Sequence, residues 1–383
     1  MKMVHKLIQK ARTAITKVRP VYNVARKIYY RQERKYLKEI YSRTLKTGDA
    51  PFPEMVIFEP TARCNLKCKM CFFNRLAQVK KDVPELTMEE IKEIFTKNRF
   101  KKVNLIGGEP MMHHNILDTM KLFDSLGMKY DLATNGTLIN AINIDTLAQM
   151  KGLVSVGMSL DGNQEMHNEI RGSPVAFQRT LEAFKMLHQK GIITNIVSVV
   201  MKENLPYLKD IVKIAHENGI KSVWFEIERY YIKNEIAQTQ SLLKVRDEDK
   251  DDVFPLMIID EYTRAYSVDE LKTSLQEAQE YGKKNGVNVF FYPDYLLTQV
   301  NDCHARTLRR NGRFMCRFIN RARIDPYGNV IHCGQLRKSF GNLKGKSFKE
   351  IWTSQEYKEF RLNLLNHNLM PICETCLNMV KIN

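Results

Sequence analysis

Two hydrophobic periodicities alternate along the chain from Met55 onward, and they predict alternating strands and helices. Short apolar or alternating runs favour strands at residues 55–59, 102–106, 129–134, 153–160, 193–200 and 221–228. Between them, apolar residues recur every three or four positions, for example in Met88–Lys97, Ile116–Leu126, Val175–Lys190 and Leu205–Asn218. This order favours parallel β/α units over an antiparallel sheet. Right-handed crossovers would then place the carboxyl ends of the strands at one rim.

The pattern changes after the sixth predicted strand. The charged stretch Lys244–Asp252 is typical of a surface excursion, and Asp269–Asn285 has the period of another helix. We therefore expect an α/β fold, with a partial (β/α)6 TIM-type barrel at residues 51–295. A small cysteine-rich α+β domain would follow at 296–383, and a basic helical arm would precede the barrel at 1–50.

Positive charge is concentrated in the arm. Residues 1–50 contain 14 Lys and Arg against three Asp and Glu, so they hold +11 of the net charge of +17. Apolar residues recur there at helical spacing, at Val4, Leu7, Ile8, Ala11, Ile15 and Val18. One interpretation is an amphipathic helix that binds an anionic membrane or another acidic partner. The other is a helix packed on the barrel with a solvated basic face.

Composition favours a cytoplasmic protein. With 44% hydrophobic residues the chain can bury a large core. No apolar run reaches the roughly 18 residues of a membrane span, and the N-terminus lacks an uninterrupted signal-peptide core. We expect a cytoplasmic location, with peripheral contact to the inner membrane face if the arm binds lipid. In a reducing compartment the eight cysteines favour metal ligation over disulfides.

Three cysteines, Cys64, Cys68 and Cys71, lie within eight residues shortly after the first predicted strand. Structural zinc sites and closed iron-sulfur sites use four protein ligands. Three thiolates leave one metal corner open to a substrate or cofactor, which is typical of a reaction centre. The spacing therefore predicts an enzyme.

This CxxxCxxC spacing resembles the radical S-adenosylmethionine (SAM) superfamily. Further motifs follow in the order found in its peptide-modifying and alcohol-oxidising branches: GGEP at Gly107–Pro110, SLDG at Ser159–Gly162, His167, and IRG at Ile170–Gly172. The resemblance covers roughly residues 51–230 and resumes near the C-terminus. Met70 departs from it, because the family often has an aromatic residue before the third cysteine.

The resemblance implies a 4Fe-4S cluster whose open iron chelates SAM, and an external one-electron donor of the flavodoxin or ferredoxin type. Reductive cleavage of SAM would give a 5′-deoxyadenosyl radical that abstracts hydrogen from a substrate. The resemblance also implies SAM contacts at Gly107, Gly108, Glu109, Ser159 and Arg171. Glu109 would hold the ammonium group, while Ser159 would lie near the ribose and Arg171 near the carboxylate.

Residues at further strand ends are candidates for the same site. Asn135 would contact SAM or form a turn, which Asn-Gly does well. Val200 would form an apolar wall for adenine. Alternation directs Glu226 and Glu228 into the barrel, where two acids are costly unless paired. They are candidates for substrate binding or a proton relay, and salt bridging to Arg229 or a lysine is the alternative.

Four further cysteines near the C-terminus are enough to close a metal site: Cys316, Cys333, Cys373 and Cys376. Asp325–Asn329, DPYGN, predicts a turn between two strands, and one helix containing EIWTSQEYKEFR should precede the last pair. The pattern resembles the shortened SPASM domain, called twitch, with one auxiliary 4Fe-4S cluster. A zinc ribbon is the alternative, since four thiolates also suit zinc. Cys303 stays unassigned, as a free buried cysteine.

These features favour a radical SAM enzyme that oxidises or crosslinks an unactivated C–H position. The substrate would be a peptide, or a lipid or lipid-linked molecule at the membrane. The auxiliary cluster would take up an electron or hold the substrate. The alternative is a basic, zinc-stabilised protein that modifies or binds nucleic acid. A nucleic-acid partner is disfavoured, because the basic residues form an amphipathic arm instead of a groove interleaved with aromatic residues.

Overall fold

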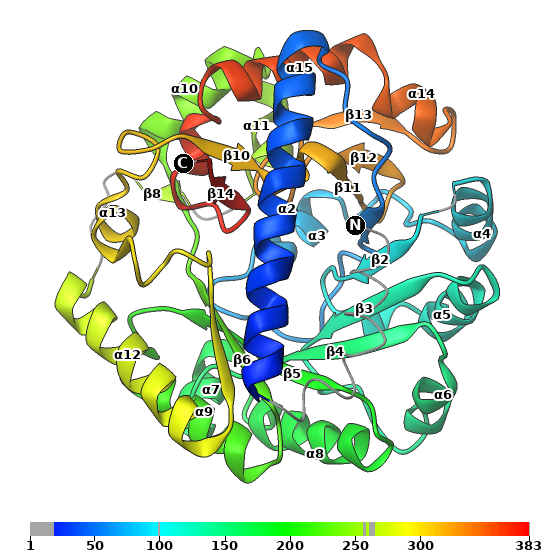
Figure 1. Ribbon diagram of the computed structural model, residues 1–383. Helices are drawn as coiled ribbons and strands as arrows, with labels where there is room; N and C mark the ends of the chain where they lie inside the picture. Colours follow the sequence, from blue (N-terminus) through cyan, green and yellow to red (C-terminus); the bar gives the residue numbers. More distant parts are fainter. Residues whose placement is uncertain (1–18, 99, 256–257, 260–264, 383) are drawn as a thin grey trace.

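Parallel strands in chain order form the centre of the protein. The computed structural model describes residues 19–98, 100–255, 258–259 and 265–382. The neighbouring strands are β1 (Met55–Phe58), β2 (Lys102–Leu105), β3 (Lys129–Thr134), β4 (Leu153–Ser159), β5 (Thr194–Val200), β6 (Ser222–Ile227) and β9 (Asn288–Tyr292). Figure 1 shows them inside a ring of helices. The partial barrel and its six predicted strands are confirmed, and β9 is a further parallel strand that was not predicted.

Helices connect successive strands and cover the outer side of this sheet (Figure 1). They are α4 (Met88–Lys97), α5 (Ile116–Ser125), α6 (Ile144–Gln149), α8 (Ala176–Gln189), α9 (Leu208–Glu217) and α12 (Val268–Asn285). In β6, Val223 and Phe225 are fully buried, whereas the alternate residues Trp224 and Glu226 are half-buried. One side of the sheet therefore packs on helices, and the other lines a barrel interior that stays partly accessible.

Two shorter helices, α3 (Phe73–Val79) and α7 (Gln164–Arg171), follow the carboxyl ends of β1 and β4. Capping explains where the longer helices begin. In α4, Thr87 and Glu90 form a reciprocal capping box, and Ser267 and Glu270 do the same for α12. The predicted helix at residues 88–97 is confirmed to the residue.

The C-terminal region continues the barrel sheet. β11 (Arg321–Ile324) pairs in parallel with β1, and β12 (Asn329–Ile331) and β13 (Ser339–Asn342) extend the sheet antiparallel. The predicted DPYGN turn joins β11 to β12. Two small pairs lie apart from this sheet: β10 (Phe314–Cys316) with β14 (Met379–Lys381), and β7 (Tyr231–Ile232) with β8 (Ile258–Ile259). The domain division at residue 296 stays a prediction, and the sheet runs across it.

The helices α10 (Lys233–Leu243) and α11 (Lys250–Val253) lie between β7 and β8 in the chain. The helices of the C-terminal region are α13 (Val300–Ala305), α14 (Phe348–Trp352) and α15 (Gln355–Asn366). The single helix predicted around EIWTSQEYKEFR is wrong, because α14 and α15 occupy that segment. They separate at Thr353 and Ser354, and the Ser354 side chain accepts a hydrogen bond from the Tyr357 amide at the start of α15. Serine favours such a cap, which explains the break.

The long helix α2 (Arg19–Thr47) packs on the C-terminal region through its second half. Leu37 and Ile40 are buried in a small apolar cluster. The other buried members of the cluster are Met315, Ile319, Leu365 and Val380. For these residues the interpretation of a packed helix holds. The apolar positions from Val4 to Val18, on which the membrane interpretation rests, lie outside the described residues.

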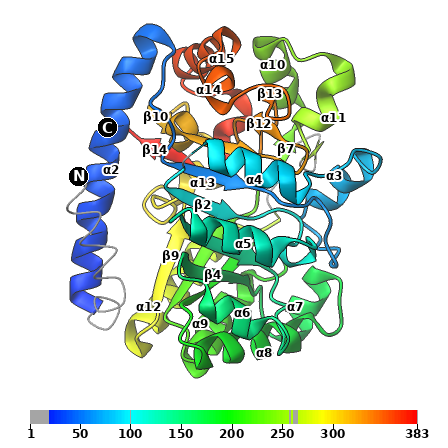
Figure 2. The ribbon, with the colours of Figure 1, turned by 90° about the vertical axis from the view of Figure 1, so that its right-hand side faces the viewer.

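α2 lies at the amino ends of the barrel strands. Glu33 forms ion pairs with Arg317 at 3.4 Å and with Arg321, the first residue of β11, at 3.0 Å. Figure 2 shows α2 on one side of the molecule and α3 and α7 on the opposite side. Among the described helices, none is both long and apolar enough to cross a membrane.

Candidate active site

The three clustered cysteines lie in the loop between β1 and α3. Cys64, Cys68 and Cys71 are half-buried and form no disulfide. Burial raises the pKa of Cys64 to about 11, and the nearby thiols of Cys68 and Cys71 act in the same direction. Bare thiolates are thus disfavoured here. A positively charged metal cluster would keep the three thiols deprotonated, so the site fits such a group.

Close backbone packing against the GGEP segment fixes this loop. The Gly108 amide donates to the Thr61 carbonyl at 2.9 Å, and the Glu109 amide donates to the Arg63 carbonyl at 2.8 Å. A Cβ on Gly108 would lie 2.1 Å from the Arg63 oxygen, and Gly107 has a φ of +145°. Glycine is required because the two backbones touch. A contact of Gly107 and Gly108 with SAM stays a prediction beside this structural role.

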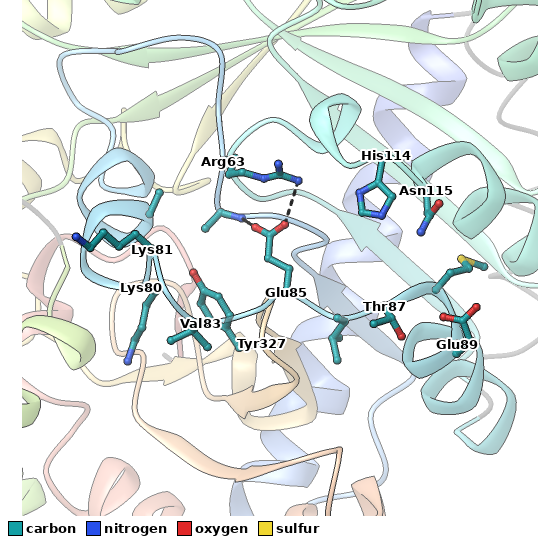
Figure 3. A pocket seen from close by; sticks show the side chains of 14 residues that line it. Arg63, Lys80, Lys81, Val83, Glu85, Thr87, Glu89, His114, Asn115 and Tyr327 are labelled. Atoms are coloured by element: carbon teal, nitrogen blue, oxygen red, sulfur yellow. Dashed lines mark hydrogen bonds and ion pairs between the residues drawn. The ribbon is translucent and has the colours of Figure 1, made fainter.

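Glu85 holds the beginning of the same loop (Figure 3). Its Oε1 accepts hydrogen bonds from the Thr61 hydroxyl at 2.6 Å and from the Ala62 amide at 2.9 Å. The Arg63 guanidinium lies 3.4 Å from Oε2. A pocket of about 670 Å³ borders these residues and extends to His114. Nothing in the sequence singles out Glu85, because its partners lie 22 to 24 residues earlier in the chain.

Glu109 follows β2 in the chain, and its buried side chain reaches the end of β3. Its carboxylate accepts hydrogen bonds from the Thr134 hydroxyl at 2.6 Å, the Asn135 amide at 2.7 Å and the Met111 amide at 3.0 Å. Burial raises the pKa of Glu109, although these donors oppose the shift. The Asn135 side-chain amide donates to the Cys64 sulfur at 3.9 Å. Both residues therefore adjoin the cysteine loop, and their roles toward SAM stay predictions.

Arg171, at the end of α7, lies between a carboxylate and a cysteine. Its Nε donates to Asp161 Oδ2 at 2.6 Å, and its Nη1 lies 3.6 Å from Cys68 Sγ. Burial alone would lower the pKa of Arg171, but Asp161 and Cys68 raise it, so the guanidinium stays charged beside the sulfur. Asp161 is fully buried and also accepts a hydrogen bond from Ser198 at 3.2 Å. Asp161 is a site residue for which the sequence predicted no role.

Ser159 and Val200 lie on different sides of the sheet. Ser159 is in register with Val197, and Val199 is in register with Glu226, so these side chains share the interior side. All four are half-buried. Val200 is fully buried in the hydrophobic core on the helix side. On β5, Val197 and Val199 are therefore the apolar residues that an adenine in the interior would meet.

Glu226 lies near the end of β6, and Arg229 follows two residues after that strand. Burial raises the pKa of Glu226, and the Arg229 guanidinium lowers it again in part. Among the described residues, no hydrogen bond or ion pair joins these two side chains. Glu228 is half-buried, and its amide donates to the Val200 carbonyl at 3.1 Å. The catalytic roles expected for Glu226 and Glu228 remain predictions.

The four C-terminal cysteines come together as the sequence indicated. Cys316 ends β10, Cys333 follows β12, and Cys373 and Cys376 belong to the CETC segment. Burial raises the pKa of Cys316 well above its ordinary value, and the other three thiols act in the same direction. The Leu336 amide points at the Cys333 sulfur, 3.3 Å away. Amide hydrogen bonds of this kind tune iron-sulfur clusters.

Cys303 occupies a different position. It is 3% exposed, in α13, where its thiol neighbours the Tyr295 ring hydroxyl. The charges that raise the pKa of Cys316 are those of Cys333, Cys373 and Cys376. The burial of Cys303 agrees with the expectation, and its exclusion from the cluster site stays a prediction.

Both cysteine sites are compatible with iron-sulfur clusters. Within the described part of the chain, no three His, Cys, Asp or Glu side chains are close enough together to hold one metal ion. Cluster ligands stand further apart, because each thiolate binds a different iron. Three thiols would leave one iron of the first cluster open, and four would close the second.

Side chains connect the two cysteine sites through the interior. The Arg337 guanidinium lies 5.9 Å from the ring of Phe72, the residue after the third clustered cysteine. It also pairs with the buried Glu59 at 2.8 Å. Tyr231 interacts electrostatically with Arg337 and with Cys333. Arg337 and Tyr231 therefore bridge the space between the first site and the second.

Two families match the chain in the same order as the two sites. Residues 58–215 match the radical SAM superfamily, and residues 316–377 match SPASM, an iron-sulfur cluster-binding domain. The AdoMet-dependent heme synthase of Oleidesulfovibrio alaskensis is 28% identical over 330 residues, which cover 83% of this chain and 79% of the synthase. The antilisterial bacteriocin subtilosin biosynthesis protein AlbA of Bacillus subtilis is 27% identical over 180 residues, which cover 47% of this chain and 40% of AlbA.

A solved structure agrees at the level of the fold. Streptococcus suis SuiB bound to S-adenosylmethionine superimposes with a TM-score of 0.59 at 17% identity, over 89% of this chain and 73% of SuiB. The likeness covers the barrel and the region after it, as do the two family matches. The chain therefore belongs to the radical SAM superfamily, and its C-terminal region is an SPASM domain.

Proposed function

We propose that this radical SAM enzyme oxidises a carboxylate-bearing tetrapyrrole in the barrel interior. The observation that carries the proposal is the connection through Phe72, Arg337 and Tyr231 between the two cysteine sites. A substrate in this interior would lie between a site that removes a hydrogen atom and a site that accepts an electron. Loss of the hydrogen atom and of one further electron would together oxidise the substrate by two electrons at one C–H position.

The chain's own residues position this chemistry, which the cofactors supply. When bound, SAM and its cluster provide a radical that abstracts a hydrogen atom. Asp161 holds Arg171 charged beside Cys68, which stabilises negative charge at the first site. Glu226 would take the proton that leaves as a carbon–carbon double bond forms, and a cluster held by the four C-terminal cysteines would accept the electron. Burial raises the pKa of Glu226, which makes its carboxylate a stronger proton acceptor.

A tetrapyrrole is supported by the extent of the likeness to the heme synthase. That relative matches 83% of this chain, whereas AlbA, a peptide biosynthesis protein by its name, matches 47%. The SuiB structure supports the fold alone. We therefore favour a tetrapyrrole over the peptide that the motifs first indicated.

The position of α2 gives no support to a lipid substrate delivered by the arm. α2 lies at the amino ends of the strands, whereas the cysteine loop lies at their carboxyl ends (Figure 2). A membrane bound along α2 would face the side away from the loop. Peripheral membrane contact stays a separate prediction about residues 1–50.

Anaerobic turnover tests the proposal. The reconstituted protein is supplied with SAM and an external one-electron donor, for which flavodoxin or ferredoxin is expected. Coproporphyrin III and its iron complex are the probes, because they carry propionate side chains on a tetrapyrrole. We expect either probe to raise 5′-deoxyadenosine formation and to yield a product lighter by H₂, or by H₂ and CO₂, in mass spectrometry. Unchanged 5′-deoxyadenosine with both probes, together with a rise on addition of peptides, would overturn it.

A further inference from the structure

Arg229 differs from the buried arginines of this protein. It lies two residues after the end of β6, is half-buried, and forms no hydrogen bond or ion pair with another described side chain. Among the described residues, five of the six buried arginines have carboxylate partners: Arg171 with Asp161, Arg306 with Glu235, Arg317 with Glu33, and Arg323 and Arg337 with Glu59. The sixth, Arg361, donates instead to the backbone carbonyls of Gly48 and Trp352. Arg229 is therefore a half-buried cation whose planar donor group is available to a ligand.

The surroundings of Arg229 place it where the barrel interior meets the auxiliary cysteines. Its charge acts on Glu226, on the interior side of β6, and on Tyr231. It also acts on the thiols of Cys333 and Cys376. A group bound to Arg229 would thus lie beside the proposed proton acceptor and beside the second cluster site.

Glu226, the acid on which the charge of Arg229 acts, forms neither a hydrogen bond nor an ion pair with it among the described side chains. A guanidinium that is partly removed from water and lacks an anion carries a desolvation cost, which an anionic ligand would offset. Its rigid fork matches the two oxygens of a carboxylate and can bind them with two parallel hydrogen bonds.

We propose that Arg229 binds a carboxylate of the substrate and so fixes the reacting C–H position between the two cysteine sites. The inference deepens the proposed function. It rests on that function for one point, that the carboxylate belongs to a side chain of a tetrapyrrole. The anchor itself requires only an anionic, planar group. Arg229→Gln should therefore weaken substrate binding, and Arg229→Lys should recover part of it, because lysine keeps the charge and loses the fork.

Binding titrations test the anchor on the reconstituted enzyme with SAM. The change in porphyrin absorbance reports the Kd of coproporphyrin III and of its fully esterified form. We expect Arg229→Gln to raise the Kd of the acid roughly tenfold or more, since a hydrogen bond to a charged group is lost. The ester should bind the wild type and the variant equally. Arg179→Gln on the exposed side of α8 is the matched control and should bind like the wild type.

A second measurement does not depend on a tetrapyrrole. Phenylglyoxal modifies accessible arginines, and peptide mass spectrometry gives the extent of modification at Arg229 separately from Arg179. We expect glutarate, a small dicarboxylate, to protect Arg229 and to leave Arg179 reactive. Inorganic phosphate is the comparison anion and should protect Arg229 less, because its shape does not match the fork as well.

The outcomes separate the anchor from the proposed function. If glutarate protects Arg229 while coproporphyrin III neither binds nor protects, the anchor stands and the tetrapyrrole is wrong. If the porphyrin binds the wild type and Arg229→Gln equally, the tetrapyrrole stands and the anchor is overturned. An Arg229 that does not react without ligand, or that phosphate protects better than glutarate, would also overturn the carboxylate site.

Discussion

The Arg171 guanidinium and the Asp161 carboxylate form a buried ion pair, with Nε 2.6 Å from Oδ2. Asp161 is fully buried and Arg171 is 8% exposed. The same guanidinium reaches Cys68 at 3.6 Å. The pair thus links the stability of the barrel to the position of the cysteine loop, because removal of either partner leaves an uncompensated buried charge.

Arg171→Gln should lower the free energy of unfolding by about 3–5 kcal/mol, the usual cost of removing one partner of a buried pair. Urea denaturation of the metal-free protein measures this loss. Lys69→Gln is the matched control, because the exposed Lys69 and Glu169 join the same loop to the same helix and should contribute little. If both variants lose a similarly small part of the free energy of unfolding, water reaches Asp161 and solvates its charge.

Gly108→Ala should displace the cysteine loop and reduce the iron held there. The added Cβ would lie 2.1 Å from the Arg63 carbonyl oxygen, and a backbone atom cannot yield as a side chain can. Gly345→Ala is the control, because nothing lies within 4 Å of the Cβ it would add. Iron content after anaerobic reconstitution is the measurement. Equal iron in both variants would show that the loop tolerates the shift.

Reconstituted protein should bind about eight irons, four for each cluster. Changing Cys64, Cys68 and Cys71 together to Ala should remove about half of them and abolish reductive cleavage of SAM. Changing Cys303 to Ser should leave the iron content unchanged, since the thiols whose charges act on Cys316 are those of Cys333, Cys373 and Cys376. A protein that holds only zinc, or a Cys303 variant that loses one cluster's iron, would contradict these assignments.

The strands of the barrel were predictable because their burial has the period of the sequence pattern. In β6 the buried and half-buried residues alternate strictly, and the three buried ones, Val223, Phe225 and Ile227, are all apolar. β9 was missed because its five residues, Asn288–Tyr292, follow closely on a helix that ends at Asn285, and only Phe290 and Phe291 among them are buried. Such a short run has no distinctive period of its own.

The two groups of cysteines could also be singled out from the sequence, because their spacing carries the signal, and their roles as cluster ligands stay predictions. Asp161, Glu85 and Arg229 could not be assigned roles in this way. Asp161 acts through Arg171, ten residues away, and Glu85 through the backbone of Ala62. Arg229 is distinguished only by the absence of a partner among the described side chains. These properties arise from three-dimensional packing and leave no trace in local composition.

Glu226 should make the stability of the protein depend on pH. Burial raises its pKa in the folded state, so the folded protein holds this proton more tightly than the unfolded chain. Its contribution is fully present below the unfolded pKa of about 4.3 and is lost as the pH rises through the folded pKa. Glu226→Gln should therefore be more stable than the wild type at neutral pH, with the difference shrinking toward acid pH.

Chemical denaturation of wild type and variant across this pH range measures the difference. Glu217→Gln, at an exposed position at the end of α9, is the control and should follow the wild type at every pH. A Glu226→Gln protein that is less stable than the wild type at neutral pH would mean that the carboxylate is stabilised in the folded state. The proton-acceptor role would then lose its physical basis.

The arm should bind anionic vesicles through residues 1–18, while Leu37 holds it to the protein. Attraction to an anionic bilayer is worth roughly 1 kcal/mol for each basic residue near the surface, and residues 1–50 carry +11. Leu7→Asp or Ile15→Asp should weaken binding at constant salt, and high salt should weaken it further, since the screening length falls to about 3 Å near 1 M. Leu37→Ala should instead lower the free energy of unfolding by about 2–5 kcal/mol, because Leu37 is buried against the C-terminal region.

Vesicle sedimentation and urea denaturation separate these two effects. Point changes are preferable to removal of the arm, because deletion up to Ala50 would also expose the apolar cluster around Leu37 and Ile40. Such exposure would itself promote vesicle binding through apolar surface. If Leu7→Asp and Ile15→Asp partition onto anionic vesicles as the wild type does at low salt, residues 1–18 do not bind the bilayer. The arm would then be a packed structural helix along its length, as its second half already is.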